Sequence, residues 1–292
     1  MSEFLILAAG ILWGTMGIFV KQITSLGYSP VEASALRWLF AAIIILIYAL
    51  IFNRSSLIIK PKDIWKFALI GIFSTLLMSS LFYISITYTS IAVSDILMYT
   101  SPVWVQIASV IFFKEKLKPK KIVCVLLAFF GCVFVSGIFS ADKISVSGLG
   151  IVCGLGAGIS YASYSIAGKY MLKEYSEITL TVYNVIFAGI AAIFTINPDK
   201  LIDELIIMPI SVIYIFAIAM LCTIIPYFLY TVGLKRTEAS RAAILCCIEP
   251  IVATVSSVFV AHEFFSIFQA IGVGLVVLSV VLLQIKAKEE IK

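Results

Sequence analysis

Long apolar stretches joined by short polar connections dominate this chain. A helix that crosses the hydrocarbon core of a membrane needs roughly 20 mostly apolar residues, and many stretches here are long enough. Six of them contain no charged residue, at 67–94, 122–141, 144–168, 178–198, 205–234 and 264–285. The pattern predicts ten membrane-spanning helices, at 4–23, 31–52, 64–86, 90–113, 120–140, 146–170, 177–197, 208–232, 239–261 and 265–286.

Composition indicates a surface covered by lipid. Hydrophobic residues make up 62% of the 292 positions and charged residues 13%, against roughly 45–50% and about 25% in soluble domains. That leaves too little polar surface to cover a water-soluble particle. The start, Met1-Ser2-Glu3, has no basic segment, so the first stretch is expected to be a retained helix and not a signal peptide. No hydrophilic segment is long enough for a soluble catalytic domain.

Positive charges alternate from one predicted connection to the next. With the N-terminus placed in the cytoplasm, 17 of the 21 Lys and Arg residues fall on the cytoplasmic side, and four fall outside. Cytoplasmic loops carry an excess of Lys and Arg, and one missed or extra helix would scramble every later loop. The distribution favours ten spans, in a multi-pass protein of the cytoplasmic membrane with both termini in the cytoplasm.

An offset of 148 residues aligns the two halves of the chain. Positions 89–117 and 237–265 share seven identities in 29 without a gap, including Pro102 with Pro250 and Glu115 with Glu263. Each half holds five predicted helices, and because five is odd the second half must enter the membrane upside down. The predicted fold class is an all-α membrane protein, with ten transmembrane helices as two inverted five-helix repeats. The expected boundaries are 1–140 and 146–286, followed by a cytoplasmic tail at 287–292.

Such inverted repeats recur in transporters, where the substrate site lies near the midplane and access alternates between the two sides. Glu249 is the most informative ionisable residue, because it falls near the middle of the ninth span, directly before Pro250. A charge at this depth is costly and should face the protein interior or a wet cavity. Pro250 has no backbone N–H, so the carbonyl of Cys246 loses its helical partner. Glu249 is predicted to be a coupling carboxylate or a counter-ion for a cation; the alternative is a structural carboxyl, protonated or paired.

Four further charged positions have weaker indications. Asp95 lies about one turn into the fourth span from the outer side, where it would either line an outward-facing vestibule or pair with Arg37. For Arg37 the structural pairing is the expected role. Glu115 and Glu263 end the fourth and ninth spans and are interpreted as helix-end charges or interhelical ties. His262, the only histidine, is expected to be a solvated loop residue.

Proline, aromatic and glycine positions complete the candidate set. Pro102 and Pro250 predict kinks in mid-membrane, either as packing features or as hinges. A glycine every fourth residue on the sixth span, at Gly150, Gly154 and Gly158, predicts a face where another helix approaches closely. Some of the aromatic residues within spans are expected to line a cavity and stack on an organic solute. The candidates are Trp13, Tyr83, Tyr99, Trp104, Tyr161 and Tyr227.

Motifs for other chemistries are absent from the sequence. There is no nucleotide-binding Gly-rich loop, HExxH or CxxC, and one histidine cannot serve a plausible catalytic triad, so neither a catalytic nor a metal site is expected. The six cysteines lie in apolar stretches and are interpreted as small hydrophobic filler. Without a cofactor, energy would come from an ion or solute gradient, with proton or ion coupling as the option. The expected partners are a small-molecule substrate and the lipid bilayer, not nucleic acid; the oligomeric state is left open.

Several of these motifs form one set. They are Trp13-Gly14, Arg37, Thr89-Ser90 with Pro102 and Glu115, Lys235-Arg236-Thr237, Glu249-Pro250 and Glu263. Together they resemble the EamA family of the drug/metabolite transporter superfamily, although that family often has Gly before the terminal Glu, where Lys114 and His262 stand here. The resemblance implies ten helices, cytoplasmic termini and a central cavity drawn mainly from spans 1, 3, 4, 6, 8 and 9. Relatives export amino acids and other metabolites, and some import.

The main hypothesis is a secondary active transporter, probably an exporter in the sense that the resemblance favours export, for a small organic metabolite such as an amino acid or amine. One alternative is an importer of a small cationic or amphipathic metabolite. A membrane-embedded enzyme acting on lipid would need a cluster of acid, base or metal-binding residues at one membrane face, which the sequence lacks. A structural or sensory subunit that does not transport is a third alternative.

Overall fold

The computed structural model describes residues 1–140, 147–195, 209–261 and 265–285. Within these ranges the chain is helical and contains no strand. The α-helices are α1 Ser2–Gly14, α2 Met16–Ser25, α3 Pro30–Phe52, α4 Ile64–Leu69, α5 Met78–Tyr88, α6 Ile91–Met98, α7 Ser101–Phe113, α8 Pro119–Val135, α9 Gly148–Met171, α10 Glu177–Ala192, α12 Ile210–Ala219, α13 Ile225–Arg236, α14 Ala239–Cys246, α15 Ile248–Ala261 and α16 Ile267–Gln284. Short 3-10 turns lie at Arg54–Leu57, Pro61–Asp63, Ile138–Ser140 and Ile193–Thr195.

These helices confirm an all-α membrane protein. Nine continuous helical segments of the described chain are long and apolar enough to cross a membrane. The tenth predicted span is α8, whose 17 residues sit at the short end of the range for a spanning helix. It ends at Val135 and not at 140, because Gly137 adopts a left-handed φ of 80°, the conformation that commonly terminates helices.

One end of the bundle gathers the basic connections, and we name it the lysine-rich end. Glu3 pairs with Arg241, and Lys120 donates to the carbonyl of Ile285, so both ends of the described chain lie there. Further contacts join the connections between alternate spans at the same end. They are Lys60 with Glu174, Lys235 with Glu177, and Lys121 with Glu115 and Glu238. The alternation that the charge pattern predicts is therefore present as contacts within one network.

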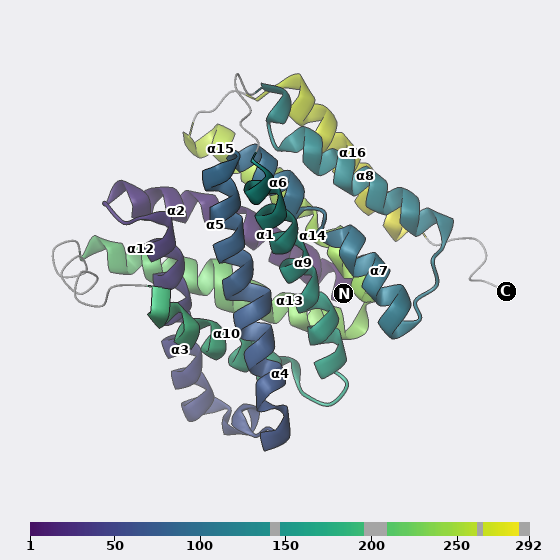
Figure 1. Ribbon diagram of the computed structural model, residues 1–292. Coiled ribbons are helices and arrows are strands. Elements are labelled where there is room, and N and C mark those ends of the chain that lie inside the picture. Colours follow the sequence, from purple (N-terminus) through teal and green to yellow (C-terminus); the bar gives the residue numbers. More distant parts are fainter. Residues whose placement is uncertain (141–146, 196–208, 262–264, 286–292) are drawn as a thin grey trace.

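The two halves interlock crosswise (Figure 1). The first span, α1, packs against α13, α14 and α15 of the second half, whereas α9, the first span of the second half, packs against α5, α6 and α7 of the first. Two pairs also join like with like: α3 with α10, and α8 with α16, which lie side by side along one flank of the molecule in Figure 1. A central cavity can form only among the helices that exchange in this way, because α8 and α16 lie to one side.

Small residues allow the crossings at the centre. An added methyl group at Gly14 on α1 would stand 2.6 Å from the carbonyl oxygen of Glu249. At Gly158 on α9, the same group would stand 2.8 Å from the carbonyl oxygen of Leu97. Both distances are too short for a carbon atom, so each helix lies directly on the backbone of the span that it crosses. The glycine stripe of the sixth span thus serves close packing.

Four spans depart from a regular α-helix inside the membrane. The fourth breaks at Tyr99–Thr100 and the ninth at Cys247, positions related by the 148-residue offset. The third and eighth contain π-helical segments, Ile70–Leu77 and Met220–Ile224, which the same offset also superimposes. Matching irregularities in the two halves place wide or broken turns around the centre of the bundle, where π-helical turns frequently accompany functional sites.

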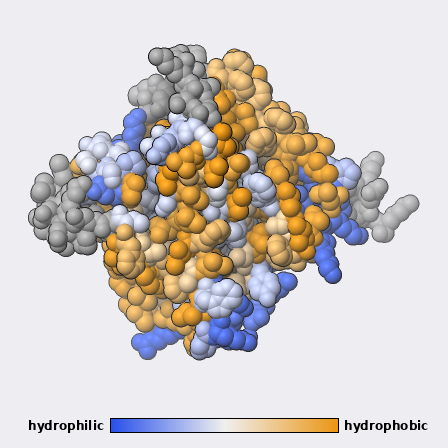
Figure 2. Space-filling view, viewed as in Figure 1, coloured by the Kyte–Doolittle hydropathy of each residue, from blue (hydrophilic) through white to orange (hydrophobic). Residues whose placement is uncertain are grey.

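The outer surface is largely apolar. Figure 2 shows hydrophobic side chains over most of the viewed face, with hydrophilic ones gathered along its lower and right-hand edges. Large apolar side chains such as Phe52, Phe112 and Val152 are more than two-thirds exposed. In a soluble monomer an apolar surface of this extent would be unusual, whereas lipid covers it in a membrane.

Candidate functional site

A cavity of about 100 Å³ lies at the centre of the bundle, among spans from both halves. It combines two charged side chains with aromatic and thioether walls. Spans 1, 3, 4, 6, 8 and 9 all contribute, as the resemblance implies, and the second span adds Ser34 and Arg37. The lining residues are Trp13, Met16, Val20, Ser34, Arg37, Met78, Ser79, Phe82, Tyr83, Met98, Tyr161, Ile218, Tyr227 and Glu249.

Glu249 enters the cavity from the second residue of α15, directly after the break at Cys247. The break forms here because Pro250 lacks an N–H, which is tolerated in the first turn of a helix. One carboxylate oxygen, Oε2, accepts a hydrogen bond from the hydroxyl of Tyr161 on α9 at 3.1 Å. On the other side, the carbonyl of Glu249 lies against Gly14. The carboxylate is thus held between the first spans of the two halves.

Arg37 faces the same cavity from α3, and only 7% of its surface is exposed. The ion pair with Asp95 that the sequence suggested is not among the ion pairs of the described residues, so that expectation was wrong. Instead, Nη1 lies 2.5 Å from the Sδ of Met16, and the guanidinium carbon lies 4.7 Å from the centre of the Trp38 ring. The buried Nε atom has no hydrogen-bond acceptor. Arg37 and Asp95 fail to meet because they lie on different sides of Glu249, within electrostatic range of it.

An aromatic cluster closes the cavity toward the lysine-rich end. Trp13 lies 5.1 Å from Tyr227 and 5.6 Å from Tyr230, measured between ring centres, and Tyr164 lies 5.1 Å from Tyr227. Hydroxyl contacts hold two of the rings: Tyr230 with Ser165 at 2.6 Å, and Tyr164 with Thr231 at 3.0 Å. All four rings are buried. A solute in the cavity cannot reach the lysine-rich end without displacing them.

Toward the opposite end the cavity adjoins a groove of about 260 Å³ between α3 and α5. The groove and the cavity share Ser34, Ser79 and Tyr83 as lining residues. Further hydroxyl groups, from Ser80, Thr87 and Thr195, line the groove itself. A polar route therefore continues from the cavity in this direction, where no aromatic cluster intervenes among the described residues.

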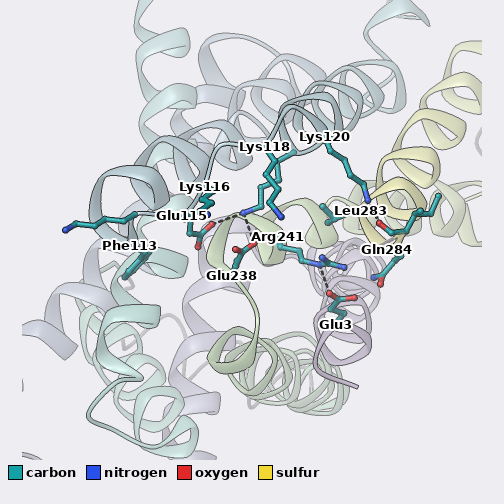
Figure 3. A pocket seen from close by; sticks show the side chains of 13 residues that line it. Glu3, Phe113, Glu115, Lys116, Lys118, Lys120, Glu238, Arg241, Leu283 and Gln284 are labelled. Carbon is teal, nitrogen blue, oxygen red and sulfur yellow. Dashed lines mark hydrogen bonds and ion pairs between the residues drawn. The ribbon is translucent and has the colours of Figure 1, made fainter. Parts of the chain in front are cut away.

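A second closure lies at the lysine-rich end itself (Figure 3). Lys121 bonds to Glu115 at 3.3 Å and to Glu238 at 2.6 Å. Glu115 also accepts from the backbone N–H of Ala239 at 3.0 Å and from the hydroxyl of Ser240. The side chains of Glu115 and Lys121 are only 7% and 10% exposed, so these contacts tie the end of the fourth span to the start of the ninth.

The pocket drawn in Figure 3 surrounds this network, with a volume of about 710 Å³. Although it is the larger space, its three carboxylates, Glu3, Glu115 and Glu238, are bonded to Arg241 or Lys121. Its lining is the basic connection that the positive-inside rule explains. We therefore take the central cavity, and not this pocket, as the solute site.

A third contact between the halves lies at the edge of the same end. Lys60 bonds to Glu174 at 2.7 Å, with both side chains about half exposed. The hydrogen bond and charge of Lys60 hold the pKa of Glu174 below its ordinary value, and Glu174 raises the pKa of Lys60. Because water and salt screen such an exposed pair, it contributes little to stability.

Five of the eight residues proposed as substrate or coupling positions line the cavity: Trp13, Tyr83, Tyr161, Tyr227 and Glu249. Asp95 and Tyr99 lie near Glu249 but do not line it. Trp104 bonds through Nε1 to the hydroxyl of Thr100 at 3.0 Å, away from the cavity. The sequence analysis missed Arg37 as a lining residue, together with three methionines and two serines. The absence of a nearby carboxylate in its own half was the available signal for Arg37.

The remaining predicted positions have structural surroundings. Pro102 is the second residue of α7 and Pro250 the third of α15, so each follows a break in its span. Glu115 lies in the network of Figure 3. Glu263 and His262 lie outside the described residues. In the part of the chain that the structure describes, no three His, Cys, Asp or Glu side chains group as metal ligands.

Comparison with known proteins covers nearly the whole chain. The model of the EamA-like transporter family matches twice, over residues 1–137 and 148–285. An uncharacterized transporter of Archaeoglobus fulgidus is 26% identical over 285 residues, which are 96% of this chain and 98% of that protein. The threonine/homoserine exporter RhtA of Escherichia coli is 26% identical over 201 residues, covering 68% of this chain and 64% of its own. One crystal structure superimposes with a TM-score of 0.79 at 17% identity, over 97% of this chain and 96% of its own, which supports the fold alone.

Proposed function

The chain belongs to the EamA-like transporter family, and from this premise we propose that it exports a small organic solute across the cytoplasmic membrane by secondary active transport. It is a multi-pass membrane transporter and not an enzyme. Identity of the solute, direction and coupling are the proposed part. The observation that carries the proposal is the buried central cavity with Glu249 and Arg37 in its wall.

The cavity has the features of a site for a small polar or amphipathic solute. It is smaller than the roughly 300–1,000 Å³ of sites for drug-sized ligands, at about 100 Å³. Aromatic rings supply flat apolar contact, and the two charged groups supply orientation. Charges at this depth are retained in membrane proteins mainly where they pair or serve a pathway.

The closures at one end support alternating access. Both the aromatic cluster and the Lys121 network block the lysine-rich end, whereas the groove at Ser34, Ser79 and Tyr83 adjoins the cavity from the other side. If the lysine-rich end faces the cytoplasm, as the charge pattern favours, this arrangement corresponds to a state closed on the inside. Two matches to one family model, and irregular turns at equivalent positions, support the inverted repeat that would produce the opposite state.

We assign coupling to Glu249. It is the carboxylate that lines the cavity, and it contacts spans from both halves through Tyr161 and Gly14. A carboxylate in this place can bind a proton or the cationic group of a solute, but not both at once. That exclusion links solute release to proton entry, and so drives export at the cost of an inward proton gradient.

Export and an amino acid or amine as the solute follow from two considerations. A relative at 26% identity is named a threonine/homoserine exporter. The cavity carboxylate suits an ammonium group, which both solute classes contain. Neither consideration depends on the other.

The test is solute flux in proteoliposomes that contain the purified chain. We expect wild-type flux to depend on pH, and the Glu249→Gln variant to lose both most of the flux and its pH dependence. Glu174→Gln is the matched control, since it makes the same change at an exposed carboxylate far from the cavity. Thermal unfolding of each variant in detergent separates loss of function from loss of fold.

Unchanged flux and unchanged pH dependence in Glu249→Gln would remove this residue from the mechanism. Absence of any solute-dependent flux by the wild-type protein, across amino acids, amines and other small metabolites, would contradict the proposed function itself. Flux without pH dependence in the wild type would exclude proton coupling and leave transport standing.

A further inference from the structure

Arg37 is a buried cation without a counter-ion bonded to it. It lines the central cavity, 93% of its surface is buried, and no carboxylate of the described residues forms an ion pair with it. Its contacts are a thioether and the face of its neighbour Trp38. A thioether sulfur is a weak acceptor, so the five N–H donors of the guanidinium remain largely unused.

This state is costly, because Arg stays charged at any pH that proteins experience and an unpaired buried charge is strongly unfavourable. The carboxylates nearest to the cavity do not relieve it. Glu249 lies within electrostatic range but gives its Oε2 atom to Tyr161, and Asp95 does not line the cavity. A bound anion in the cavity would supply the missing partner.

Resting on the proposed function, we propose that Arg37 binds the carboxylate of the transported solute while Glu249 binds its ammonium group. The solute class is then a zwitterion with both groups close together, an amino acid, and not a simple amine. Both protein groups line one cavity of about 100 Å³, and the planar guanidinium fits a carboxylate with two parallel hydrogen bonds.

Charge balance favours the same assignment. With the cavity empty, Arg37 and Glu249 partly neutralise each other across it. A zwitterion satisfies both groups and leaves the net charge of the site unchanged. An amine alone would neutralise Glu249 and strand Arg37, and a simple carboxylate would do the reverse.

The two anchors also come from different halves of the chain. Arg37 lies on α3 of the first half and Glu249 on α15 of the second. Under the 148-residue offset, Arg37 corresponds to Val185 and Glu249 to Ser101, so neither charge is duplicated. A bound amino acid therefore bridges the halves in one orientation, with its carboxylate toward α3.

The experiment measures ligand-induced thermal stabilisation of the purified protein in detergent, because a ligand that binds the folded state raises the unfolding temperature. The probes are the twenty common L-amino acids, and for each that binds, its decarboxylated amine and its deaminated acid. The variants are Arg37→Met, Arg37→Lys and, as the matched control, Arg241→Met, which removes an arginine of the lysine-rich end.

We expect at least one amino acid to stabilise the wild type, and both of its truncated analogues to bind far more weakly. Arg37→Met should weaken amino acid binding roughly 10- to 100-fold, as expected for a charged hydrogen bond, and leave amine binding unchanged. Arg37→Lys should lose part of the affinity, since it keeps the charge but not the fork. Without ligand, Arg37→Met should unfold at the wild-type temperature or higher, because no protein partner is lost.

An amine that binds as well as its parent amino acid would overturn the assignment of Arg37, as would unchanged amino acid affinity in Arg37→Met. Lower unfolding temperature of ligand-free Arg37→Met, together with unchanged amino acid affinity, would identify a structural role instead. If no amino acid binds while another metabolite is transported in proteoliposomes, the inference fails and the proposed function survives.

Discussion

Gly14→Ala is the substitution whose effect the structure specifies most closely. The added methyl group would stand 2.6 Å from the carbonyl oxygen of Glu249 and 2.6 Å from the Cβ atom of Val252. Carbon atoms in ordinary contact lie about 3.5–4.0 Å apart, so the crossing is too close by about 1 Å. The atoms in the way are backbone and a β-carbon, which no side-chain rotation can move. Either α1 shifts away from α15, or the break at Cys247 deforms.

The expected cost is about 1–3 kcal/mol, the usual range for an overpacked interior. Solute affinity should fall as well, because the shifted backbone is that of Glu249 itself. Gly17→Ala is the matched control: it lies one turn further along the same span and has no neighbouring atom within 4 Å of the added group. In that variant stability should be unchanged or slightly higher, since Ala favours helix over Gly by about 1 kcal/mol.

The assay is denaturant or thermal unfolding of both variants in the same detergent, followed by solute binding. Equal stability and equal affinity of Gly14→Ala and Gly17→Ala would refute the reasoning, because the close crossing of α1 over Glu249 would then have no energetic consequence. Loss of stability without loss of affinity would restrict Gly14 to packing.

Two further predictions concern the site and its closure. Tyr161→Phe removes the hydroxyl that donates to Glu249 at 3.1 Å; we expect solute affinity to fall roughly tenfold, about 1.4 kcal/mol, in equilibrium binding, and an unchanged affinity would show that the carboxylate is positioned by other groups. Lys121→Met leaves Glu115 and Glu238 without their shared cation; the closed lysine-rich end should lose about 3 kcal/mol, measured as faster labelling of a cysteine at Ser165 from the cytoplasmic side. Lys60→Met, which breaks an exposed pair, is the control, and equal labelling in the two variants would count against a role for Lys121 in closure.

Most of the fold follows from the hydrophobic pattern, because a spanning helix must satisfy its backbone internally and therefore needs a long apolar stretch. The structure begins and ends nine segments close to the predicted limits. The exception, at 120–140, ends early at Gly137, whose left-handed backbone the pattern does not reveal. The π-helical segments at Ile70–Leu77 and Met220–Ile224 were also missed, since they carry no composition that differs from an α-helix.

The site was predicted only in part, because hydropathy says which helices lie in the membrane but not which way each one faces. Trp13, Tyr161 and Glu249 face the cavity, whereas Trp104 was chosen on the same grounds and turns toward Thr100. The expected pair of Arg37 with Asp95 shows the same limit. Both lie near one end of neighbouring spans, but the crosswise exchange of α1 and α9 sets which side chains meet, and only tertiary packing determines that exchange.

The most direct test of the account is whether the central cavity opens to both sides of the membrane. Ser79 lines the cavity and lies where the groove adjoins it, so a Ser79→Cys substitution in a variant without the six native cysteines reports access. A small membrane-impermeant thiol reagent is applied to right-side-out and to inverted vesicles. The account predicts reaction from both sides, slowed by solute, with Lys235→Cys reacting from the cytoplasmic side alone. Reaction of Ser79→Cys from one side only, under conditions in which solute crosses the membrane, would contradict it.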